Sequence, residues 1–506
     1  MTKATIIHGD CLEELKNLDD NSIDAVICDP PYGLSNTKPA QVADVLKAWV
    51  TGDTVSVPAK RGGFMGKDWD SFVPPPAVWE ECMRVLKPGG HMAVFAGART
   101  QDLMGLSIRL AGFEIRDTLG WIYGSGFPKS HDIGKAIDKY NGNPLAFREF
   151  AAAYREAVAK SGLTHSAIDK ALGIKSSSCY WARDDHRGGM PPRHHWEKVR
   201  DLVYIPKELE RLYDEAEREV VGVKRVNGAE GSAGGFANGI ASQRELATGE
   251  REINVTAPAT SEAQRWDGWG TSLKPAIEPI LLCRKPLDGT VANNVLAHGV
   301  GGLNIDACRV HSEDAPEGRT RHGGGIPGNG SSCELPDVRP ASPAGRFPAN
   351  VLLDEHAAKE MDKQSGNRRG FAGGGDTPGE VGNDVYGKGW KRNENPQYYS
   401  DEGGASRFFP VFKYQAKAPK RERPVIERED GSKIQHPTVK PEKLMEWLVE
   451  LITPPGGVVL DPFAGSGTTL QAALNKGFQP IGIEQDADYI KLIEKRLEAT
   501  CTTHKN

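Results

Sequence analysis

The stretch IDAVICDPPY, residues 23–32, predicts a buried β-strand that runs directly into a rigid polar turn. Before it, ATIIHGD predicts a short strand and CLEELKNL an amphipathic helical turn, which together give the β-α-β order of a parallel sheet. The segments that follow predict further elements of this kind: a helix at 77–86, a break at Pro88-Gly89-Gly90, a strand over HMAVFAG, a helix through Leu110 and a strand at 113–123. The start of the chain is therefore predicted to be α/β.

The other end of the chain repeats the α/β pattern. Pro441 stands where a first helical residue is expected, and the apolar residues after it share one helical face. GGVVLDPF then predicts a buried strand, 468–476 a helix closed by Gly477, QPIGIEQ another strand, and 486–499 a final helix. Both ends of the chain are thus expected to contribute to α/β structure.

The middle of the chain has a different character. Charged helical segments between residues 130 and 260 lead into NGAEGSAGGFANG, which predicts an exposed loop, and an insertion is the simplest interpretation. Residues 272–287 return to strand character, and glycine-rich pieces recur between 311 and 404 without a fixed period.

The composition limits the class of protein. A chain of 506 residues is expected to form more than one structural unit. Lys and Arg total 63 against 68 for Asp and Glu, so any basic surface for nucleic acid must be local. The sequence shows no apolar run long enough to cross a membrane and no signal-peptide core, so we expect a cytoplasmic protein without membrane contact.

The eight cysteines are scattered and include no C-x-x-C pair, which argues against a disulfide framework or a zinc ribbon. Cys179 precedes His186, His194 and His195 at a loosely ligand-like spacing, but solvated histidines explain this pattern equally well. We therefore expect no metal.

The turn Asp29-Pro30-Pro31-Tyr32 follows its strand at the edge where open α/β sheets bind ligands. Neither proline has an N–H, so the turn displays a carboxylate and carbonyl oxygens with little freedom to move. If Asp29 and the Pro30 carbonyl accept the two N–H groups of a nucleobase amine, the nitrogen lone pair is directed at an electrophile. Tyr32 would stack on the base. Taken alone, the same four residues also fit a rigid turn with a capping Asp and a packed Tyr.

A second motif, VVLDPFAGSGTT at 458–469, places glycines between a buried strand and a helix, where a ligand can approach the backbone closely. Leu470 stands where the dinucleotide fingerprint requires Gly, and the P-loop lysine is absent, so nucleotide phosphates are disfavoured. Glu484 ends the next strand, where a carboxylate commonly binds ribose hydroxyls. A helix cap or a surface charge is the alternative role for Glu484.

Together these segments resemble the amino-group DNA methyltransferases that use S-adenosylmethionine, in the permuted beta order. The resemblance rests on Asp29 to Tyr32 as the catalytic tetrapeptide, DPFAGSG (461–467) as the cofactor loop, Glu484 as the ribose carboxylate, and HPTVKP (436–441). Gly9-Asp10 matches the end of the family's first strand. Three further stretches resemble phage and prophage members, which are mostly specific for adenine N6: WIYGSGFPKS (121–130), WDGWGTSLKPAIEPI (266–280) and SRFFPVFKYQAK (406–417).

The resemblance implies a Rossmann-like methyltransferase sheet assembled from both chain ends, with a large central insertion. It implies S-adenosylmethionine as the cofactor, with Asp10 at its adenine, and contacts from Asp10, Lys440, Asp461, Phe463, Gly465, Ser466, Gly467, Thr468, Glu484 and Gln485. The domains expected on this basis are a catalytic half (1–130), a helical insertion (131–265), a return strand (266–288), a glycine-rich target-recognition region (289–430) and a cofactor-binding half (431–506).

In such an enzyme the target base must leave the duplex, and other surfaces must hold the DNA. Candidates are a helix-turn-helix around 164–185 and the basic stretches 367–369 and 417–423. Each of the two basic stretches also fits a solvated face. Four aromatic residues are candidates for the base pocket, although core packing is the commoner role for any one of them: Trp121, Phe127, Trp266 and Trp269.

We therefore expect a DNA methyltransferase that acts on adenine N6 without a metal, in the cytoplasm of a bacterium or a phage-infected host. Cytosine N4 stays open, because both bases present an amino group to the same acceptors. A DNA-binding regulator whose methyltransferase ends are a relic is an alternative from another class. DNA is the expected partner, and a homodimer and a companion restriction endonuclease are left open.

Overall fold

The computed structural model describes residues 3–35, 37–58, 70–124, 126, 130–140, 144–174, 177–183, 189–216, 220–227, 244–245, 250–256, 261–310, 345–371, 398–412, 423–428 and 430–503. The chain divides into two compact units, and the first combines Met1–Gly126 with Ala276–Asn506. The second unit is Phe127–Pro275. Across the described ranges, no helix combines the length and the apolar character needed to span a membrane.

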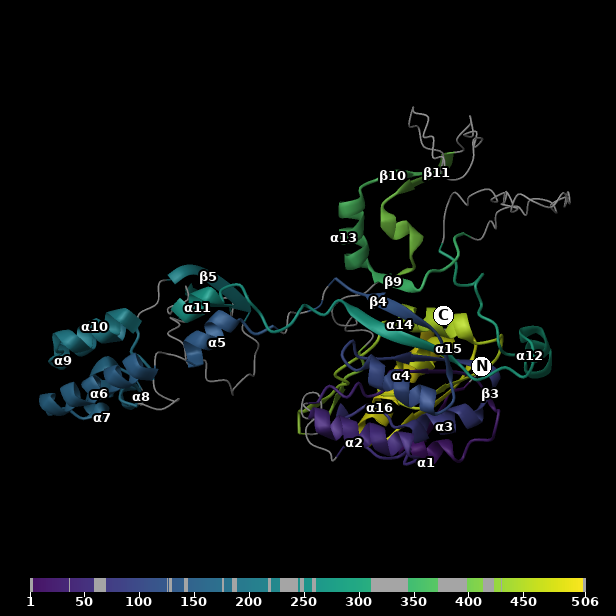
Figure 1. The fold of residues 1–506 in the computed structure, drawn as a ribbon, viewed down its shortest axis with the longest axis horizontal. Helices are drawn as coiled ribbons and strands as arrows, with labels where there is room; N and C mark the ends of the chain where they lie inside the picture. Colours follow the sequence, from purple (N-terminus) through teal and green to yellow (C-terminus); the bar gives the residue numbers. More distant parts are fainter. Residues whose placement is uncertain are drawn as a thin grey trace, which may run out of the picture. The chain divides into compact units, whose positions relative to one another are not determined.

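The first unit is built on a nine-stranded sheet that interleaves the two ends of the chain (Figure 1). Its order is β1 (Thr5–His8), β16 (Gln479–Glu484), β15 (Val458–Asp461), β2 (Ile23–Cys28), β3 (Leu86–Phe95), β8 (Ile277–Arg284), β4 (Glu114–Ile122), β9 (Val351–Asp354) and β12 (Val411–Phe412). Strand β8 runs antiparallel to both of its neighbours, and the other pairings are parallel. The α/β sheet predicted from both chain ends is confirmed.

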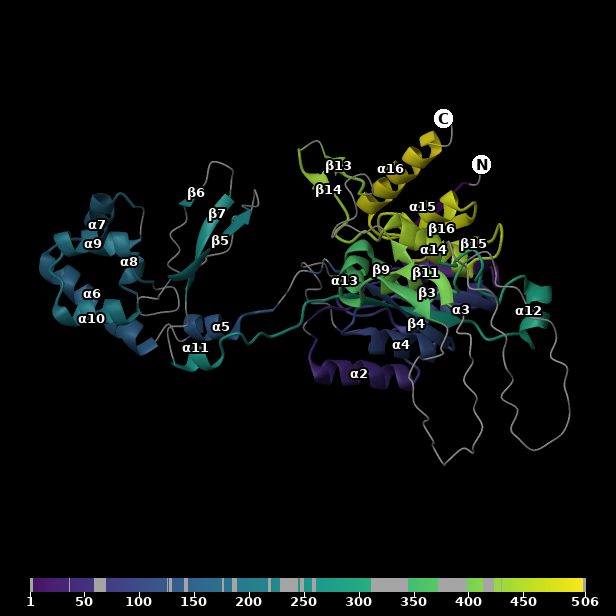
Figure 2. The same ribbon diagram turned by 90° about the horizontal axis from the view of Figure 1, so that it is seen from above.

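Helices cover both faces of this sheet, which explains why the central strand β2 is buried at all six positions. Val26 and Cys28 of β2 face one hydrophobic core, whereas Ala25 and Ile27 face another, as the two-residue period of a strand requires. Figure 2 shows α2 and α4 on one side and α14 on the other. The helices of this unit are α1 (Cys11–Leu15), α2 (Pro39–Val50), α3 (Pro76–Val85), α4 (Gln101–Leu110), α12 (Val291–His298), α13 (Glu355–Ser365), η3 (Ala405–Phe408), α14 (Glu442–Ile452), α15 (Thr468–Asn475) and α16 (Ala487–Thr503).

The break predicted at Pro88-Gly89-Gly90 is wrong in its position. Helix α3 ends at Val85, and β3 begins at the next residue. Leu86 pairs with Ile23 and His91 pairs with Ala25, so the residues between them form an irregularity within the strand. Gly89 sits there with a φ of 77°, a conformation that suits glycine. The Pro-Gly-Gly sequence therefore bends a strand and does not separate two elements.

Two short hairpins also belong to the first unit. One pairs β10 (Arg368–Phe371) with β11 (Tyr398–Gly403), and the other pairs β13 (Ile426–Glu427) with β14 (Lys433–Ile434). Pro441 directly precedes α14 as its cap residue and is not its first helical residue.

The second unit has its own aromatic core, in which Phe150, Tyr154, Trp196 and Tyr213 are fully buried. Its helices are α5 (Ile133–Tyr140), α6 (Pro144–Ser161), α7 (His165–Leu172), α8 (Ser178–Trp181), α9 (Arg193–Leu202), α10 (Lys207–Ala216) and α11 (Ser261–Arg265). A three-stranded antiparallel sheet, absent from the sequence predictions, has the order β5 (Val220–Asn227), β7 (Glu250–Thr256) and β6 (Arg244–Glu245). The loop predicted after Asn227 lies outside the described residues.

The segment predicted as a helix-turn-helix contains α7 and α8, and residues 175 and 176 between them lie outside the described ranges. Gly173 ends α7 in the left-handed conformation, and the carboxylate of Asp169 accepts a hydrogen bond of 2.7 Å from the backbone N–H of Ser178. Helix α8 has only four residues.

Candidate functional site

Four carboxylates stand at one edge of the sheet, at the ends of four neighbouring strands. Asp10 follows β1 after one intervening residue, Glu484 ends β16, Asp461 ends β15, and Asp29 follows β2 directly. Because these strands are parallel, their carboxyl ends meet at the same edge, which is where open α/β sheets bind ligands. A cluster of carboxylates suits a cationic ligand with hydroxyl groups better than one with phosphates.

The turn after β2 is held by contacts from two other segments. The carboxylate of Asp70, which is buried, accepts hydrogen bonds from the backbone N–H groups of Tyr32 (2.7 Å) and Gly33 (3.0 Å). The hydroxyl of Thr100 donates to the Tyr32 carbonyl at 2.6 Å. Gly33 has a φ of 66°, and a Cβ there would lie 2.7 Å from the backbone nitrogen of Val73, so glycine is required. The turn is therefore rigid, as its prolines predicted.

The side chains of the turn contact one another and Lys440. The Tyr32 hydroxyl donates to Asp29 Oδ1 at 2.7 Å, and Lys440 Nζ lies 3.1 Å from the same oxygen. Lys440 was expected at the cofactor, but the contacts of its ammonium are to this turn and to Glu278 of β8, at 3.0 Å. Burial and the Asp29 charge both raise the pKa of Tyr32, so its hydroxyl stays protonated and acts as a donor.

The glycine loop after β15 is tied to Glu484 through its backbone. The two carboxylate oxygens of Glu484 accept from the N–H groups of Gly465 (2.7 Å) and Asp486 (2.8 Å). Gly465 and Gly467 have φ values of 52° and 77°. A Cβ on Gly465 would lie 3.1 Å from the His436 ring, which places the first residue of HPTVKP against this loop. Each carboxylate oxygen has two lone pairs, so Glu484 can still accept further hydrogen bonds.

A buried arginine supports the loop from the last helix. Arg496 of α16 donates from Nε to the Ser466 carbonyl at 2.6 Å. Phe463 packs against Trp79 with ring centroids 6.1 Å apart, and Thr468 is buried at the start of α15. The remaining predicted cofactor residues lie at the ends of strands: Asp10 caps α1 by accepting from the Leu12 N–H at 3.0 Å, and the Gln485 carbonyl lies 3.2 Å from the His8 ring.

Four residues that contact these segments were not predicted as site residues: Asp70, Thr100, Glu278 and Arg496. Glu278 lies within the 266–280 stretch noted above, but no local pattern singles out any of the four side chains, because each acts through a contact with another segment of the chain. Of the aromatic candidates, Trp121 packs in the core against Phe412, with ring centroids 5.9 Å apart. Trp266 and Trp269 form an exposed pair on the second unit, and Phe127 lies outside the described residues.

Burial raises the pKa of Asp461 to about 7. The charges of Asp29 and Glu484 raise this pKa further, whereas hydrogen bonds from Thr469 and Phe463 lower it. The ordinary value is 3.8, so between about pH 4 and about pH 7 the folded chain keeps a proton that the unfolded chain has lost. Stability contributed by this group is therefore lost as the pH rises through that window.

Asp461→Asn should remove this dependence, because the amide cannot ionise but still offers an oxygen to the Phe463 N–H. We expect the variant to be more stable than the wild type at about pH 8 and to show a flatter curve of melting temperature against pH. Calorimetric melting across that range measures this, with Asp44→Asn on the exposed surface of α2 as the control. Parallel curves for the Asp461 variant and the wild type would contradict the buried, protonated Asp461.

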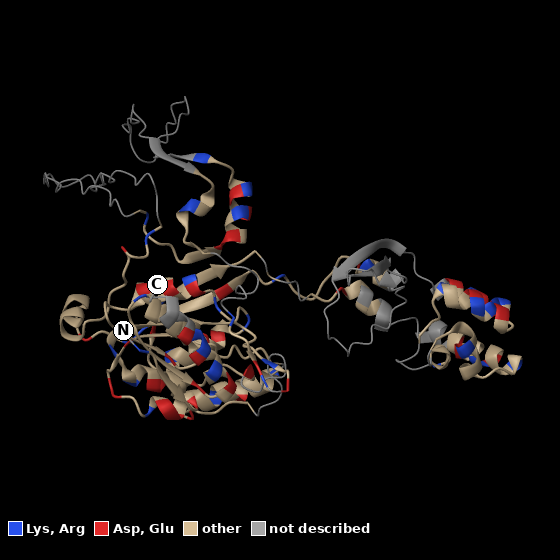
Figure 3. Cartoon of the chain, turned by 180° about the vertical axis from the view of Figure 1, so that it is seen from behind, with Lys and Arg blue, Asp and Glu red and all other residues tan. Residues whose placement is uncertain are grey.

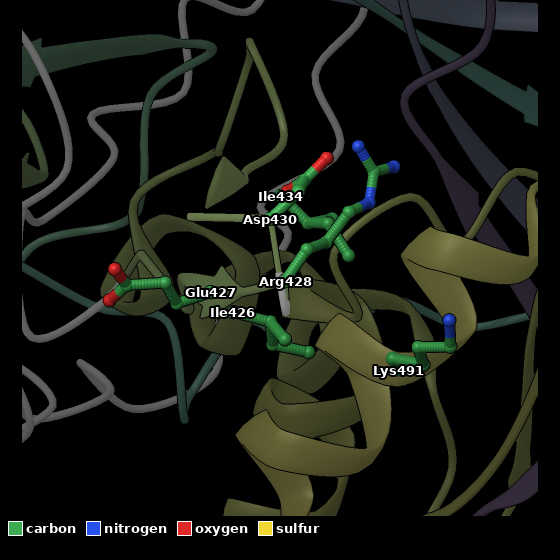
Figure 4. A pocket seen from close by; sticks show the side chains of 6 residues that line it. All are labelled: Ile426, Glu427, Arg428, Asp430, Ile434 and Lys491. Carbon is green, nitrogen blue, oxygen red and sulfur yellow. The ribbon is translucent and has the colours of Figure 1, made fainter. Parts of the chain in front are cut away.

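The first unit also contains a pocket that includes none of the residues of the turn after β2 or of the glycine loop. It lies between the β13–β14 hairpin and α16 (Figure 4) and is lined by Ile426, Glu427, Arg428, Asp430, Ile434 and Lys491. Arg428 and Lys491 both pair with Asp488 there. In the ranges that the structure describes, no group of three His, Cys, Asp or Glu residues could hold a metal ion.

Charged residues of both signs are interspersed on α13 and on the helices of the second unit (Figure 3). Of the two predicted basic stretches, 367–369 is described, with Arg368 exposed in β10, and all of 417–423 except Arg423 lies outside the described residues.

The family model and the relatives that match parts of this chain are described as DNA methylases or methyltransferases. The N6/N4 family model described as DNA methylase matches residues 252–495, just under half of the chain; this range includes the glycine loop and Glu484 but not Asp29 to Tyr32. The Type II methyltransferase M2.DpnII of Streptococcus pneumoniae is 46% identical over 70 residues, which cover 14% of this chain and 26% of that protein. The DNA adenine methyltransferase YhdJ of Escherichia coli K12 is 48% identical over 63 residues, 12% and 21% of the two chains.

The chain thus spans about a quarter of the length of the curated relatives it matches. Among solved structures, the crystal structure of the M1.HpyAVI–SAM complex aligns with 98% of this chain and 99% of that one, at 13% identity and a TM-score of 0.32.

Proposed function

We propose that this chain transfers the methyl group of S-adenosylmethionine to adenine N6 in DNA. The observation that carries the proposal is the position of two motifs: the Asp29 turn and the glycine loop follow adjacent strands, β2 and β15, which pair at Ala25–Val459 and Val26–Leu460. The match to a DNA methylase family and the local similarity to a DNA adenine methyltransferase support the same chemistry.

The residues present fit a sulfonium nucleoside. The acidic edge offers carboxylates to a cation and to ribose hydroxyls, and the glycines allow close approach to the backbone. We assign Glu484 to the ribose and Asp10 to the adenine, with Asp461, Phe463, Gly465, Ser466, Gly467, Thr468 and Gln485 around them. When bound, S-adenosylmethionine supplies an electrophilic methyl group.

The residues of the turn would prepare the nucleophile. Asp29 and the Pro30 carbonyl accept the two N–H groups of the target amine, which directs the nitrogen lone pair toward the methyl carbon. Methyl transfer would form the N–C bond as the donor's C–S bond breaks, and the methylated nitrogen would then release one proton to water. Because that nitrogen is cationic after transfer, its proton is acidic and no strong base is needed. The Tyr32 ring, held by its hydroxyl contacts, is assigned to stack on the base.

We further propose that residues 289–430 and the second unit, with its helices α7 and α8, contact the DNA from which the base is flipped. The permuted beta order, the kinship with phage enzymes, a homodimer, a companion endonuclease and a location in the cytoplasm remain predictions from the sequence.

Nucleoside mass analysis of DNA treated with the purified chain and isotopically labelled S-adenosylmethionine tests the proposal. We expect labelled N6-methyladenine. Labelled N4-methylcytosine would overturn the choice of base and keep amino-group transfer. DNA without label, from a folded protein that still binds the DNA, would reject the enzyme and favour a DNA-binding regulator.

A further inference from the structure

Lys440 occupies the centre of a buried polar cluster. An ammonium has three N–H donors, and those of Lys440 face three acceptors: the Tyr32 hydroxyl at 2.8 Å, Glu278 Oε2 at 3.0 Å and Asp29 Oδ1 at 3.1 Å. The side chain is about nine-tenths buried, and its ammonium lies over the rings of Phe95 (4.7 Å) and Tyr32 (5.2 Å). The cluster joins the turn after β2, strand β8 and the segment before α14.

The two carboxylate oxygens of Asp29 differ in the contacts that they make with the protein. The Tyr32 hydroxyl and the Lys440 ammonium both lie at Oδ1. Among the residues that the structure describes, none makes a hydrogen bond or ion pair with Oδ2. Oδ1 is therefore engaged by the protein, and Oδ2 keeps its lone pairs for another donor.

We infer that Lys440 and Glu278 form a clamp that positions Asp29 so that Oδ2 accepts the N–H of the target amine. This inference rests on the proposed function and adds two positioning residues to it. Neither Lys440 nor Glu278 is assigned a contact with substrate. They act through Asp29 and Tyr32, which are fixed in one orientation before the base arrives.

The charges of the clamp explain why it contains a second carboxylate. Two carboxylates share one ammonium, which leaves a net negative charge beside the nitrogen that becomes positive during transfer. Without Glu278, the ammonium would pair with Asp29 alone and weaken it as an acceptor. Burial by itself would lower the pKa of Lys440, but Asp29 and Glu278 together raise it above its ordinary value, so Lys440 stays cationic and takes up no proton.

The test uses the full chain with Lys440→Gln, Glu278→Gln and the double variant. Single-turnover methyl transfer is followed at one pH, about pH 8, at saturating cofactor and DNA. Glu278→Gln should slow transfer by about 10-fold, and Lys440→Gln by about 100-fold.

In Lys440→Gln the carboxylates of Asp29 and Glu278 face each other with no cation between them, and their repulsion should displace Asp29 from its orientation. The double variant lacks the repelling carboxylate, so its rate should move back from that of Lys440→Gln toward that of the wild type. Lys16→Gln, which removes a surface lysine that pairs with Glu13, is the matched control and should match the wild type.

Two results would overturn the clamp and leave the proposed function standing, provided that the wild-type chain transfers methyl groups. One is variants that keep the wild-type rate, and the other is a double variant no faster than Lys440→Gln. A wild-type chain that binds the cofactor and transfers nothing to DNA would overturn the proposed function instead. In that case melting at about pH 8 still tests the cluster. If the cluster is correct, the double variant is more stable than Lys440→Gln, and equal stability overturns it.

Discussion

Asp29→Ala is expected to slow methyl transfer by about 1,000-fold while S-adenosylmethionine binding stays nearly unchanged. The substitution removes the carboxylate that accepts the amine N–H in the transition state. The residues assigned to the cofactor stand at the ends of β1, β15 and β16 and keep their contacts. Single-turnover transfer measures the rate, and calorimetric titration measures cofactor affinity.

Two further variants serve as controls for Asp29→Ala. Asp44→Ala removes an exposed carboxylate of α2 and should behave as the wild type in both assays. Asp29→Asn keeps an oxygen acceptor and should lie between alanine and the wild type. An Asp29→Ala protein with wild-type turnover would refute the role of the turn, and one that loses cofactor binding as well would show that Asp29 belongs to the cofactor site.

Glu484→Ala is expected to weaken S-adenosylmethionine binding by about 10- to 100-fold, the loss typical of hydrogen bonds to a charged group. The variant loses the carboxylate assigned to the ribose, and it leaves the N–H groups of Gly465 and Asp486 without their acceptor. Calorimetric titration of the folded variant measures the loss.

Glu427→Ala provides the control, because Glu427 is an exposed carboxylate that lines the separate pocket between the β13–β14 hairpin and α16. If Glu484 served only as a structural cap, its alanine variant would melt at a lower temperature but bind the cofactor with unchanged affinity once folded. That result would remove Glu484 from the cofactor site.

The strands of the sheet were predictable because a strand that is buried on both faces has a nearly continuous run of apolar residues. IDAVIC is apolar on both faces except at Asp24, and the structure explains that exception: Asp24 sits near the start of β2, accepts from the Val458 N–H at 2.7 Å and pairs with Lys87 at 2.6 Å. Both ends of the chain contain such apolar runs alternating with helical segments, so a sheet built from the two ends could be predicted.

The contacts that shape the site could not be anticipated in this way. Glu278 is one carboxylate in the strand IEPILLCR, and only the antiparallel placement of β8 between β3 and β4 brings that strand into the sheet beside the turn. Lys440 belongs to a recognisable motif, yet the direction of its side chain depends on a partner 408 residues away, Tyr32. The sheet of the second unit was missed because strands such as EREINVT mix charged and apolar residues without a regular alternation.

In the proposed enzyme, the turn after β2 and the glycine loop after β15 form one site, with the methyl donor on the loop and the target amine at the turn. A structure of the chain with S-adenosylmethionine bound would test this arrangement. We expect the ribose hydroxyls at Glu484 and the sulfonium methyl facing the Pro30 carbonyl and Asp29 Oδ2. A nucleoside bound away from the loop, or a methyl group directed away from the turn, would contradict it.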